Sequence, residues 1–183
     1  MMKYRWLLVL GILSGLAVIV WIALPQTEPA VKPGSGTSGF FLPDLQGEMQ
    51  SLPKGEVVLL NFWATWCPPC RQEIPSMIAL DDRYAADGLK IVAVSVDHRL
   101  EDLTRFVGEY NMPFQVLHDG NSAVSQQFGV FRFPESFLID RQGKVRYHLI
   151  GAIDWMSAEV VETIETMLKE DGDVSGDIQP GGS

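Results

Sequence analysis

The chain has 183 residues, 46% of them hydrophobic, and a formal net charge of −9 at pH 7. That length is enough for one domain with appendages, and the excess of acidic side chains argues against nucleic acid and anionic lipid headgroups as partners. Two cysteines in 183 residues exclude a scaffold held together by many disulfides.

The N-terminus has a short positive stretch followed by an apolar run. Lys3 and Arg5 precede residues 6–24, which carry no charge. At about 1.5 Å per helical residue, this run can span the roughly 30 Å hydrocarbon core of a bilayer. It exceeds the apolar segment of about 7–15 residues that is usual in a signal peptide, and no small-x-small cleavage site follows it. We therefore expect residues 1–24 to be an uncleaved, single-pass anchor in the cytoplasmic membrane, with a cytoplasmic N-terminus and the remainder exported. A cleaved signal peptide is the alternative.

The rest of the chain divides by composition. Residues 25–38 are rich in Pro, Gly, Ser and Thr and have too few apolar groups to pack, which predicts a flexible linker. Residues 171–183 are polar and rich in glycine, and we expect them to form a disordered tail. These assignments leave residues 39–170 as the folded domain.

Within this domain, strand and helix patterns alternate, which predicts an α/β fold. Residues 39–52 have the pattern of a hairpin with its turn at Gln46-Gly47. The apolar run Val57–Leu60 is typical of a buried strand in a parallel sheet. The elements expected after it are, in order, a helix over 71–87 ended by Gly88, a strand over 89–97, a helix over 100–110, a strand over 114–117, a helix from Asn121 to Phe128, a hairpin of residues 136–140 and 144–150, and a last helix capped by Asp154 or Ser157.

Both cysteines, Cys67 and Cys70, lie where the expected strand turns into a helix. A sulfur at a helix N-terminus faces unpaired backbone N–H groups and the positive end of the helix dipole, which favours its thiolate. The spacing puts the second sulfur one turn along, within reach of the first. The alternative is that both cysteines are buried structural thiols, in which case their spacing and their place at the start of a helix would be a coincidence. No further cysteine exists for a zinc site of three or four thiolates, and His98, His118 and His148 lack ligand spacing, so we expect no metal.

The residues around the cysteines carry a family resemblance. The string Phe-Trp-Ala-x-Trp-Cys-x-x-Cys that begins at Phe62, with Pro75 after it, resembles the active site of the thioredoxin superfamily. The fuller stretch 61–75 is similar to the membrane-anchored thiol–disulfide interchange proteins of the TlpA/ResA/DsbE type. The resemblance covers about residues 39–170. It implies a thioredoxin-like fold, with a central mixed β-sheet and helices on both faces, and dithiol–disulfide exchange without a cofactor. Two further segments show the same likeness, residues 41–47 and 134–140.

Three side chains are candidates for catalysis. Cys67, at the helix start, is the expected attacking thiolate, exposed and of lower pKa, and Cys70 is the shielded thiol that resolves the mixed disulfide. Glu73 lies one turn beyond Cys70 and is suited to exchanging the proton of that thiol. The alternative for Glu73 is an exposed first-turn acid favoured by the helix dipole. Thioredoxins have an aspartate at the position of Asn61, and asparagine cannot serve as that acid, which favours the catalytic role for Glu73.

Three further residues are candidates for binding a partner. Trp66 is expected at the surface beside the disulfide. Pro134 resembles the cis-proline that faces the cysteines in this superfamily and presents an edge of backbone to an extended substrate; an ordinary trans proline is the alternative. Phe133 is larger than the residue usual at its position, and Arg132 stands where a glycine is usual. Both departures bear on the choice of partner.

These features predict an extracytoplasmic protein thiol–disulfide oxidoreductase that exchanges a Cys67–Cys70 disulfide with exported proteins, mainly as a reductase supplied by a membrane electron donor. The resemblance implies cytochrome c maturation, with apocytochrome c as a partner, as one such task. Two alternatives stay open. A thiol peroxidase of the same fold would have threonine three residues before its cysteine, where this chain has Ala64. A metal-handling module that serves a copper centre would have three residues between its cysteines plus a histidine, whereas the spacing here is two.

Overall fold

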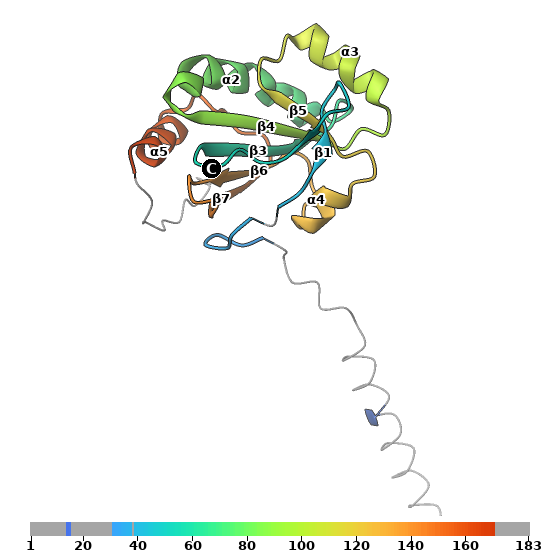
Figure 1. Ribbon diagram of the computed structural model, residues 1–183, viewed down its shortest axis with the longest axis horizontal. Helices are drawn as coiled ribbons and strands as arrows, with labels where there is room; N and C mark the ends of the chain where they lie inside the picture. The colour runs from blue at the N-terminus through green and yellow to red at the C-terminus, as the bar shows by residue number, and fades with distance from the viewer. Residues whose placement is uncertain (1–13, 16–30, 38, 171–183) are drawn as a thin grey trace, which may run out of the picture.

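The computed structural model describes residues 14–15, 31–37 and 39–170 (Figure 1). The expected anchor apart from residues 14–15, the first part of the expected linker and the expected tail lie outside these residues. None of the helices in the described part of the chain is long and apolar enough to cross a membrane.

The domain is built on a five-stranded mixed sheet in the order β5-β4-β3-β6-β7. The central strand β3 pairs in parallel with β4 and antiparallel with β6; β5 continues the parallel half and β7 the antiparallel half. Every residue of β3 is buried, because helices or loops cover both of its faces. The mixed sheet expected from the resemblance is therefore present. Its strands are β3 (Val57–Trp63), β4 (Leu89–Ser95), β5 (Gln115–His118), β6 (Glu135–Ile139) and β7 (Val145–Ile150).

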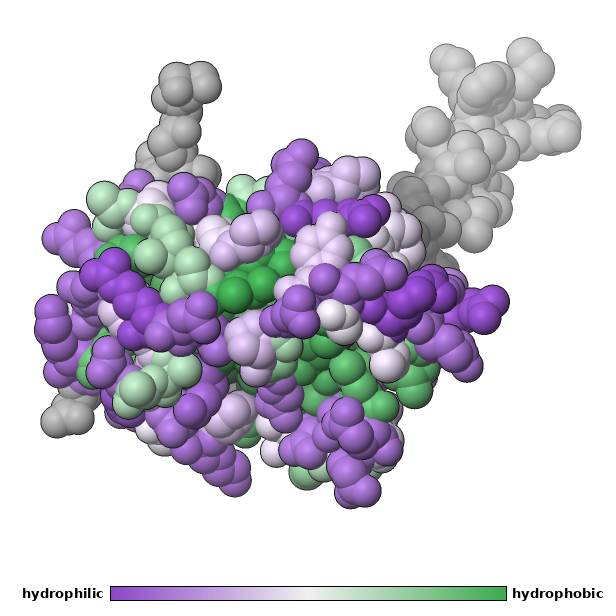
Figure 2. Space-filling view, turned by 90° about the horizontal axis from the view of Figure 1, so that it is seen from above, coloured by the Kyte–Doolittle hydropathy of each residue, from purple (hydrophilic) through white to green (hydrophobic). Residues whose placement is uncertain are grey.

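Helices cover both faces of the sheet, as predicted (Figure 1). On one face, α2 (Pro68–Tyr84), α3 (Leu100–Tyr110) and α5 (Ala158–Lys169) pack their apolar sides in one core cluster with residues of β3, β4, β5 and β6. On the other face lie α4 (Ala123–Gln127) and the hairpin of β1 (Leu42–Pro43) and β2 (Met49–Gln50). The outer surface is mostly hydrophilic on the face seen in Figure 2, in keeping with the acidic composition.

The end of α2 follows the sequence prediction closely. A short 3-10 helix, η1 (Ala85–Asp87), extends α2, and Gly88 then ends it with a φ of 98°. That left-handed conformation suits glycine, which has no Cβ to clash. The start of α2 is earlier than expected, at Pro68 instead of Arg71, because the first helical positions need no N–H partner and accept proline.

The start of α4 differs from the prediction in its capping residue. We expected Asn121 to cap this helix, and its Oδ1 does accept the N–H of Ala123. The buried carboxylate of Asp119 accepts two further N–H groups, those of Val124 and Ser125. The acid of the preceding Asp-Gly pair therefore caps more of the helix than the asparagine does.

The boundary of the expected linker at residue 38 is wrong, because residues 31–37 are attached to the domain. The N–H of Gly34 donates to the carbonyl of Val145, and the N–H of Val145 donates to the carbonyl of Ser35, at 2.7 and 3.0 Å. Val31 is also buried in the core cluster that includes α4. Backbone pairing with the edge strand β7 needs few apolar side chains, so composition could not reveal it.

Candidate active site

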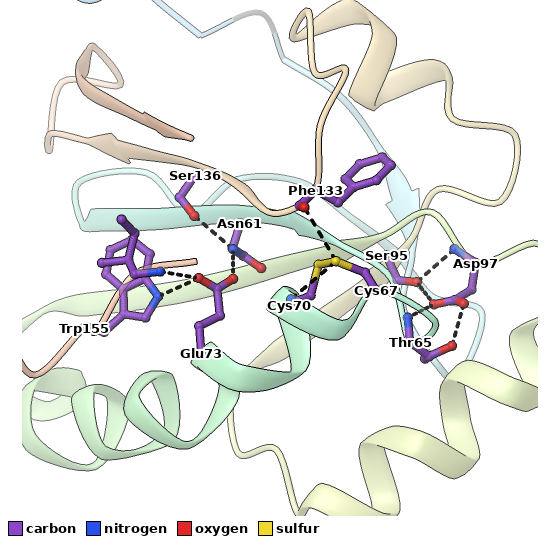
Figure 3. Close-up of a disulfide and its surroundings, with 11 residues drawn as sticks. Asn61, Thr65, Cys67, Cys70, Glu73, Ser95, Asp97, Phe133, Ser136 and Trp155 are labelled. Carbon is purple, nitrogen blue, oxygen red and sulfur yellow. Dashed lines mark hydrogen bonds between the residues drawn. A yellow bond between two sulfur atoms is a disulfide. The ribbon is translucent and has the colours of Figure 1, made fainter. Parts of the chain in front are cut away.

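The two cysteines form a disulfide where β3 leads into α2. Cys67 is the N-cap residue of α2, and the N–H of Cys70 donates to its sulfur at 3.3 Å (Figure 3). Two prolines occupy the first helical positions, so the N–H of Cys70 is free to point at the sulfur of Cys67. When the disulfide is reduced, this N–H and the helix dipole stabilise a thiolate on Cys67.

The expectation that Cys67 is exposed is wrong for the disulfide form. Cys67 is 4% exposed and Cys70 is 1% exposed. The sulfur of Cys67 is covered by the loop before β6, and the carbonyl oxygen of Phe133 lies 3.6 Å from it. The order of attack therefore stays a prediction that rests on the place of Cys67 at the helix start.

The peptide bond between Phe133 and Pro134 is cis, as the resemblance implied. This geometry turns the carbonyl of Phe133 toward the disulfide (Figure 3). A cis X-Pro bond is uncommon in folded proteins and marks a specific local requirement. Here it places a stretch of backbone beside the reacting sulfur, where an extended partner chain could pair with it.

Aromatic side chains lie next to Cys67 in the sequence and on the loop before β6. Trp66 is 62% exposed, and its ring meets the ring of Phe133 edge to face, with the centroids 6.1 Å apart. Phe131, in the same loop as Phe133, is 78% exposed. We call Trp66, Phe131 and Phe133 the aromatic rim. Sequence reasoning selected Trp66 and Phe133 but missed Phe131, whose signal was an aromatic residue two positions before another one.

Glu73 is buried beneath the site, so its alternative reading as an exposed first-turn acid is wrong. It is 2% exposed and accepts N–H groups from Asn61 at 2.8 Å, from the Ile153 backbone at 3.2 Å and from the Trp155 indole at 3.3 Å. Burial raises the pKa of Glu73 to about 7 from an ordinary value of 4.5, although hydrogen bonds from Ile153, Asn61 and Trp155 act in the opposite direction. A carboxyl group with this pKa can both give and take a proton near neutral pH.

Asn61 links Glu73 to the sheet, a role that sequence reasoning missed. Its side-chain nitrogen donates to Glu73 and also to the hydroxyl of Ser136, at 2.9 Å (Figure 3). Asn61 and Ser136 are direct neighbours on the paired strands β3 and β6. The available signal was one polar residue inside the otherwise apolar strand β3.

A second buried carboxylate, Asp97, holds the loop that leads to Cys67. Its two oxygens accept the N–H of Thr65 at 2.9 Å, the hydroxyl of Thr65 at 2.7 Å and the hydroxyl of Ser95 at 2.7 Å. Asp97 thereby fixes the residue next to Trp66. Because the hydroxyl of Thr65 donates its hydrogen to Asp97, it cannot donate that hydrogen to a peroxide bound at Cys67, which disfavours the peroxidase alternative.

Each of the three histidines has a ring nitrogen within hydrogen-bond distance of a protein oxygen. His98 and His118 contact backbone carbonyls of Gly120 and Asp97, and His148 contacts Glu135. Within residues 31–37 and 39–170, no three metal-ligating side chains lie close enough together to hold an ion.

A thioredoxin-like sheet, a redox-active Cys-x-x-Cys disulfide at a helix start and a facing cis-proline together define a thiol–disulfide oxidoreductase. The AhpC/TSA family matches residues 36–148, more than half of the chain, and the chain belongs to this family. It is similar to the thiol-disulfide oxidoreductase ResA of Geobacillus thermodenitrificans, with 33% identity over 151 residues that cover 81% of this chain and 87% of that protein.

Two solved structures extend the comparison. A Chlorobium tepidum protein assigned to the thiol:disulfide interchange protein DsbE is 34% identical, with a TM-score of 0.71 over 75% of this chain and 99% of its own. StoA from Bacillus subtilis is 27% identical, with a TM-score of 0.59 over 72% of this chain and 98% of its own. The chain is thus a thiol–disulfide oxidoreductase of the ResA/DsbE type, with protein thiols as its class of substrate.

Proposed function

We propose that the protein is a membrane-anchored reductase that acts outside the cytoplasm on the disulfides of exported proteins. The observation that carries the proposal is the disulfide at the start of α2, with the carbonyl of Phe133 3.6 Å from the sulfur of Cys67. The likeness to ResA and DsbE supports it. The positive residues before the apolar run 6–24 support the orientation, with the domain on the exported side.

The reaction has two exchanges. In the first, the thiolate of Cys67 attacks one sulfur of the partner's disulfide, forming a mixed disulfide and releasing the partner's other sulfur as a thiolate that takes up a proton. In the second, Cys70 loses its proton and attacks the sulfur of Cys67. The Cys67–Cys70 disulfide forms, and the partner leaves with its second thiol. The partner gains two electrons and the enzyme loses two, which a membrane donor then restores.

Glu73 is the group that we propose takes the proton of Cys70. It lies one helical turn from Cys70 on α2, and its raised pKa of about 7 means that it is partly ionised at neutral pH. Ionised Glu73 accepts the proton, directly or through one water, as Cys70 becomes a nucleophile. When the disulfide is reduced again, protonated Glu73 returns it. The nearby donors Asn61 and Trp155 hold its carboxylate in place through both steps.

Apocytochrome c is the partner that we propose, because its haem-attachment cysteines must be kept reduced outside the cytoplasm. The full-length reduced protein should reduce an oxidised peptide that contains the Cys-x-x-Cys-His haem-attachment sequence. The Cys70→Ala variant should trap that peptide as a mixed disulfide, and the Cys67→Ala variant should trap none. If the peptide stays oxidised while a small disulfide is reduced, apocytochrome c is not the partner. Turnover of hydrogen peroxide in the same reductant-coupled assay would instead favour the peroxidase.

Anchoring needs its own test. The N-terminus of the protein recovered from membranes should be at or near Met1, and an impermeant thiol reagent should label Cys67 of the reduced protein in intact cells. A mature N-terminus near residue 25 or later would show that the apolar run is a cleaved signal peptide.

A further inference from the structure

Another buried carboxylate, Glu135, holds the loop that carries Phe131 and Phe133. Glu135 directly follows the cis-proline and is 3% exposed. One of its oxygens, Oε1, accepts the backbone N–H groups of Phe131 and Arg132, at 3.2 and 3.0 Å. The backbone of this loop is therefore held by hydrogen bonds to a side chain of β6.

The other oxygen of Glu135 ties the loop to β7. His148 Nε2 lies 2.8 Å from Glu135 Oε2, and the imidazole stacks flat on the ring of Phe137, with centroids 4.4 Å apart. Stacking on Phe137 restricts the imidazole of His148. The contact with His148 in turn helps to hold the Glu135 carboxylate in place. The backbone of Phe131 and Arg132, directly before Phe133, is thus tied to β6 and β7 through the side chain of Glu135.

This loop lies beside the disulfide. It carries the exposed ring of Phe131, the ring of Phe133 against Trp66, and the carbonyl 3.6 Å from the sulfur of Cys67. Aromatic rings held in a fixed place favour large apolar or aromatic side chains on a partner. An extended segment that brings its cysteine to Cys67 therefore lies beside this loop and its aromatic side chains.

We propose that Glu135 is a positioning residue that holds Phe131 and Phe133 in place, and that these rings select partner segments with a large apolar or aromatic side chain next to the reactive cysteine. This proposal rests on the proposed function, because it concerns the substrates of the same disulfide. Glu135 acts through the loop; the proton chemistry belongs to Glu73.

The test measures how the full-length reduced protein reduces three different disulfides. The first is a peptide disulfide with phenylalanine beside the cysteine, the second is the same peptide with serine there, and the third is bis(2-hydroxyethyl) disulfide, which has no flanking residues. The unaltered protein should have a KM for the phenylalanine peptide that is roughly 2- to 13-fold below that for the serine peptide, the range expected for one aromatic contact. Equal KM values would overturn the proposal, whereas no reduction of any of the three disulfides would overturn the proposed function.

The variants separate positioning from simple damage. Glu135→Ala should lose the preference by raising the KM for the phenylalanine peptide more than the KM for the serine peptide. Glu135→Gln keeps an oxygen that can accept the two loop N–H groups, so it should restore the preference. Phe131→Ser should weaken the preference without touching the loop tether, and combining it with Glu135→Ala should have no larger effect than the stronger single change. Met49→Ser, which removes an exposed apolar side chain from β2, is the control.

Other results would count against the proposal. If Glu135→Ala lowers kcat equally for all three disulfides while the preference persists, Glu135 acts on the chemistry or on the fold. If Glu135→Ala does not fold, Phe131→Ser decides, because that residue is exposed and its replacement leaves the core intact. An unchanged preference in Phe131→Ser would then contradict the selective role of the loop.

Discussion

Glu73 and Asp97 are both buried carboxylates near one disulfide, yet their surroundings suit them to different tasks. Glu73 is 2% exposed and Asp97 is 3% exposed. The donors to Glu73 come from β3 and from the segment before α5, and none of them belongs to the loop that carries Cys67. The donors to Asp97 are Thr65, two residues before Cys67, and Ser95 on β4.

The difference shows that burial alone does not make a carboxylate a catalyst. Glu73 lies one turn along the helix from the thiol that must change its protonation, and its pKa is raised to about 7. Asp97 instead ties two loops together, and Glu135 does the same for the loop before β6. One acid is suited to proton exchange, and the other two are suited to holding the loops beside the disulfide in place.

The largest expected effect is a fall in the rate of thiol–disulfide exchange when Glu73 is replaced. Glu73→Gln keeps the size of the side chain but removes its titrating proton, so the rate should fall by about 10²–10⁴-fold, as for loss of one acid–base partner. The pH profile of the rate should lose the ionisation near pH 7. Stopped-flow reduction of bis(2-hydroxyethyl) disulfide between roughly pH 5 and 9 would measure both. An unchanged rate and profile would reduce Glu73 to a structural residue like Asp97.

A second effect should appear in the pH dependence of stability. Because the folded disulfide form raises the pKa of Glu73 from 4.5 to about 7, the fold prefers the protonated acid. Stability should therefore be highest below about pH 4.5, fall as the pH rises to about 7, and change no further from this group above that. At about 1.4 kcal/mol per pKa unit, the full loss is about 3 kcal/mol.

Chemical denaturation of the oxidised protein and of Glu73→Gln at several pH values would measure that loss. The free energy of unfolding of the variant, relative to the unaltered protein, should rise by about 3 kcal/mol between roughly pH 4.5 and 7, because glutamine does not titrate. A constant difference across this range would mean that Glu73 has no raised pKa.

The comparison also shows which parts of the site a sequence can predict. The placement of Cys67 and Cys70 at a strand-to-helix junction followed from local patterns: an apolar run, two prolines and helical spacing. The exchange class followed from the same stretch together with its family resemblance. Gly88 was placed correctly as the end of the helical segment for the same reason, since a helix end is decided by a few neighbouring residues.

The parts that could not be predicted depend on contacts between distant segments. Ile153 and Trp155 donate to Glu73 from about 80 residues away, so the sequence showed the acid but not its burial. The attachment of residues 31–37 to β7 is made by backbone groups, which every sequence has. The low exposure of Cys67 depends on the loop that ends at the cis-proline, which folds over it from another part of the chain.

The smallest expected effect concerns Asp97. Thr65→Val keeps the shape and the backbone N–H of residue 65 but leaves one oxygen of Asp97 without its hydroxyl donor. An unsatisfied buried acceptor of this kind costs about 1–3 kcal/mol, so the free energy of unfolding should fall by that amount. Thr65→Ser restores the hydroxyl and is the matched control. If Asp97 only holds the loop, the rate of reduction of bis(2-hydroxyethyl) disulfide by Thr65→Val should stay within about tenfold of the unaltered protein, well short of the loss expected for Glu73→Gln. If the rate in Thr65→Val falls as far as in Glu73→Gln, and the pH profile also changes, Asp97 takes part in the chemistry. The two carboxylates would then not differ in their tasks.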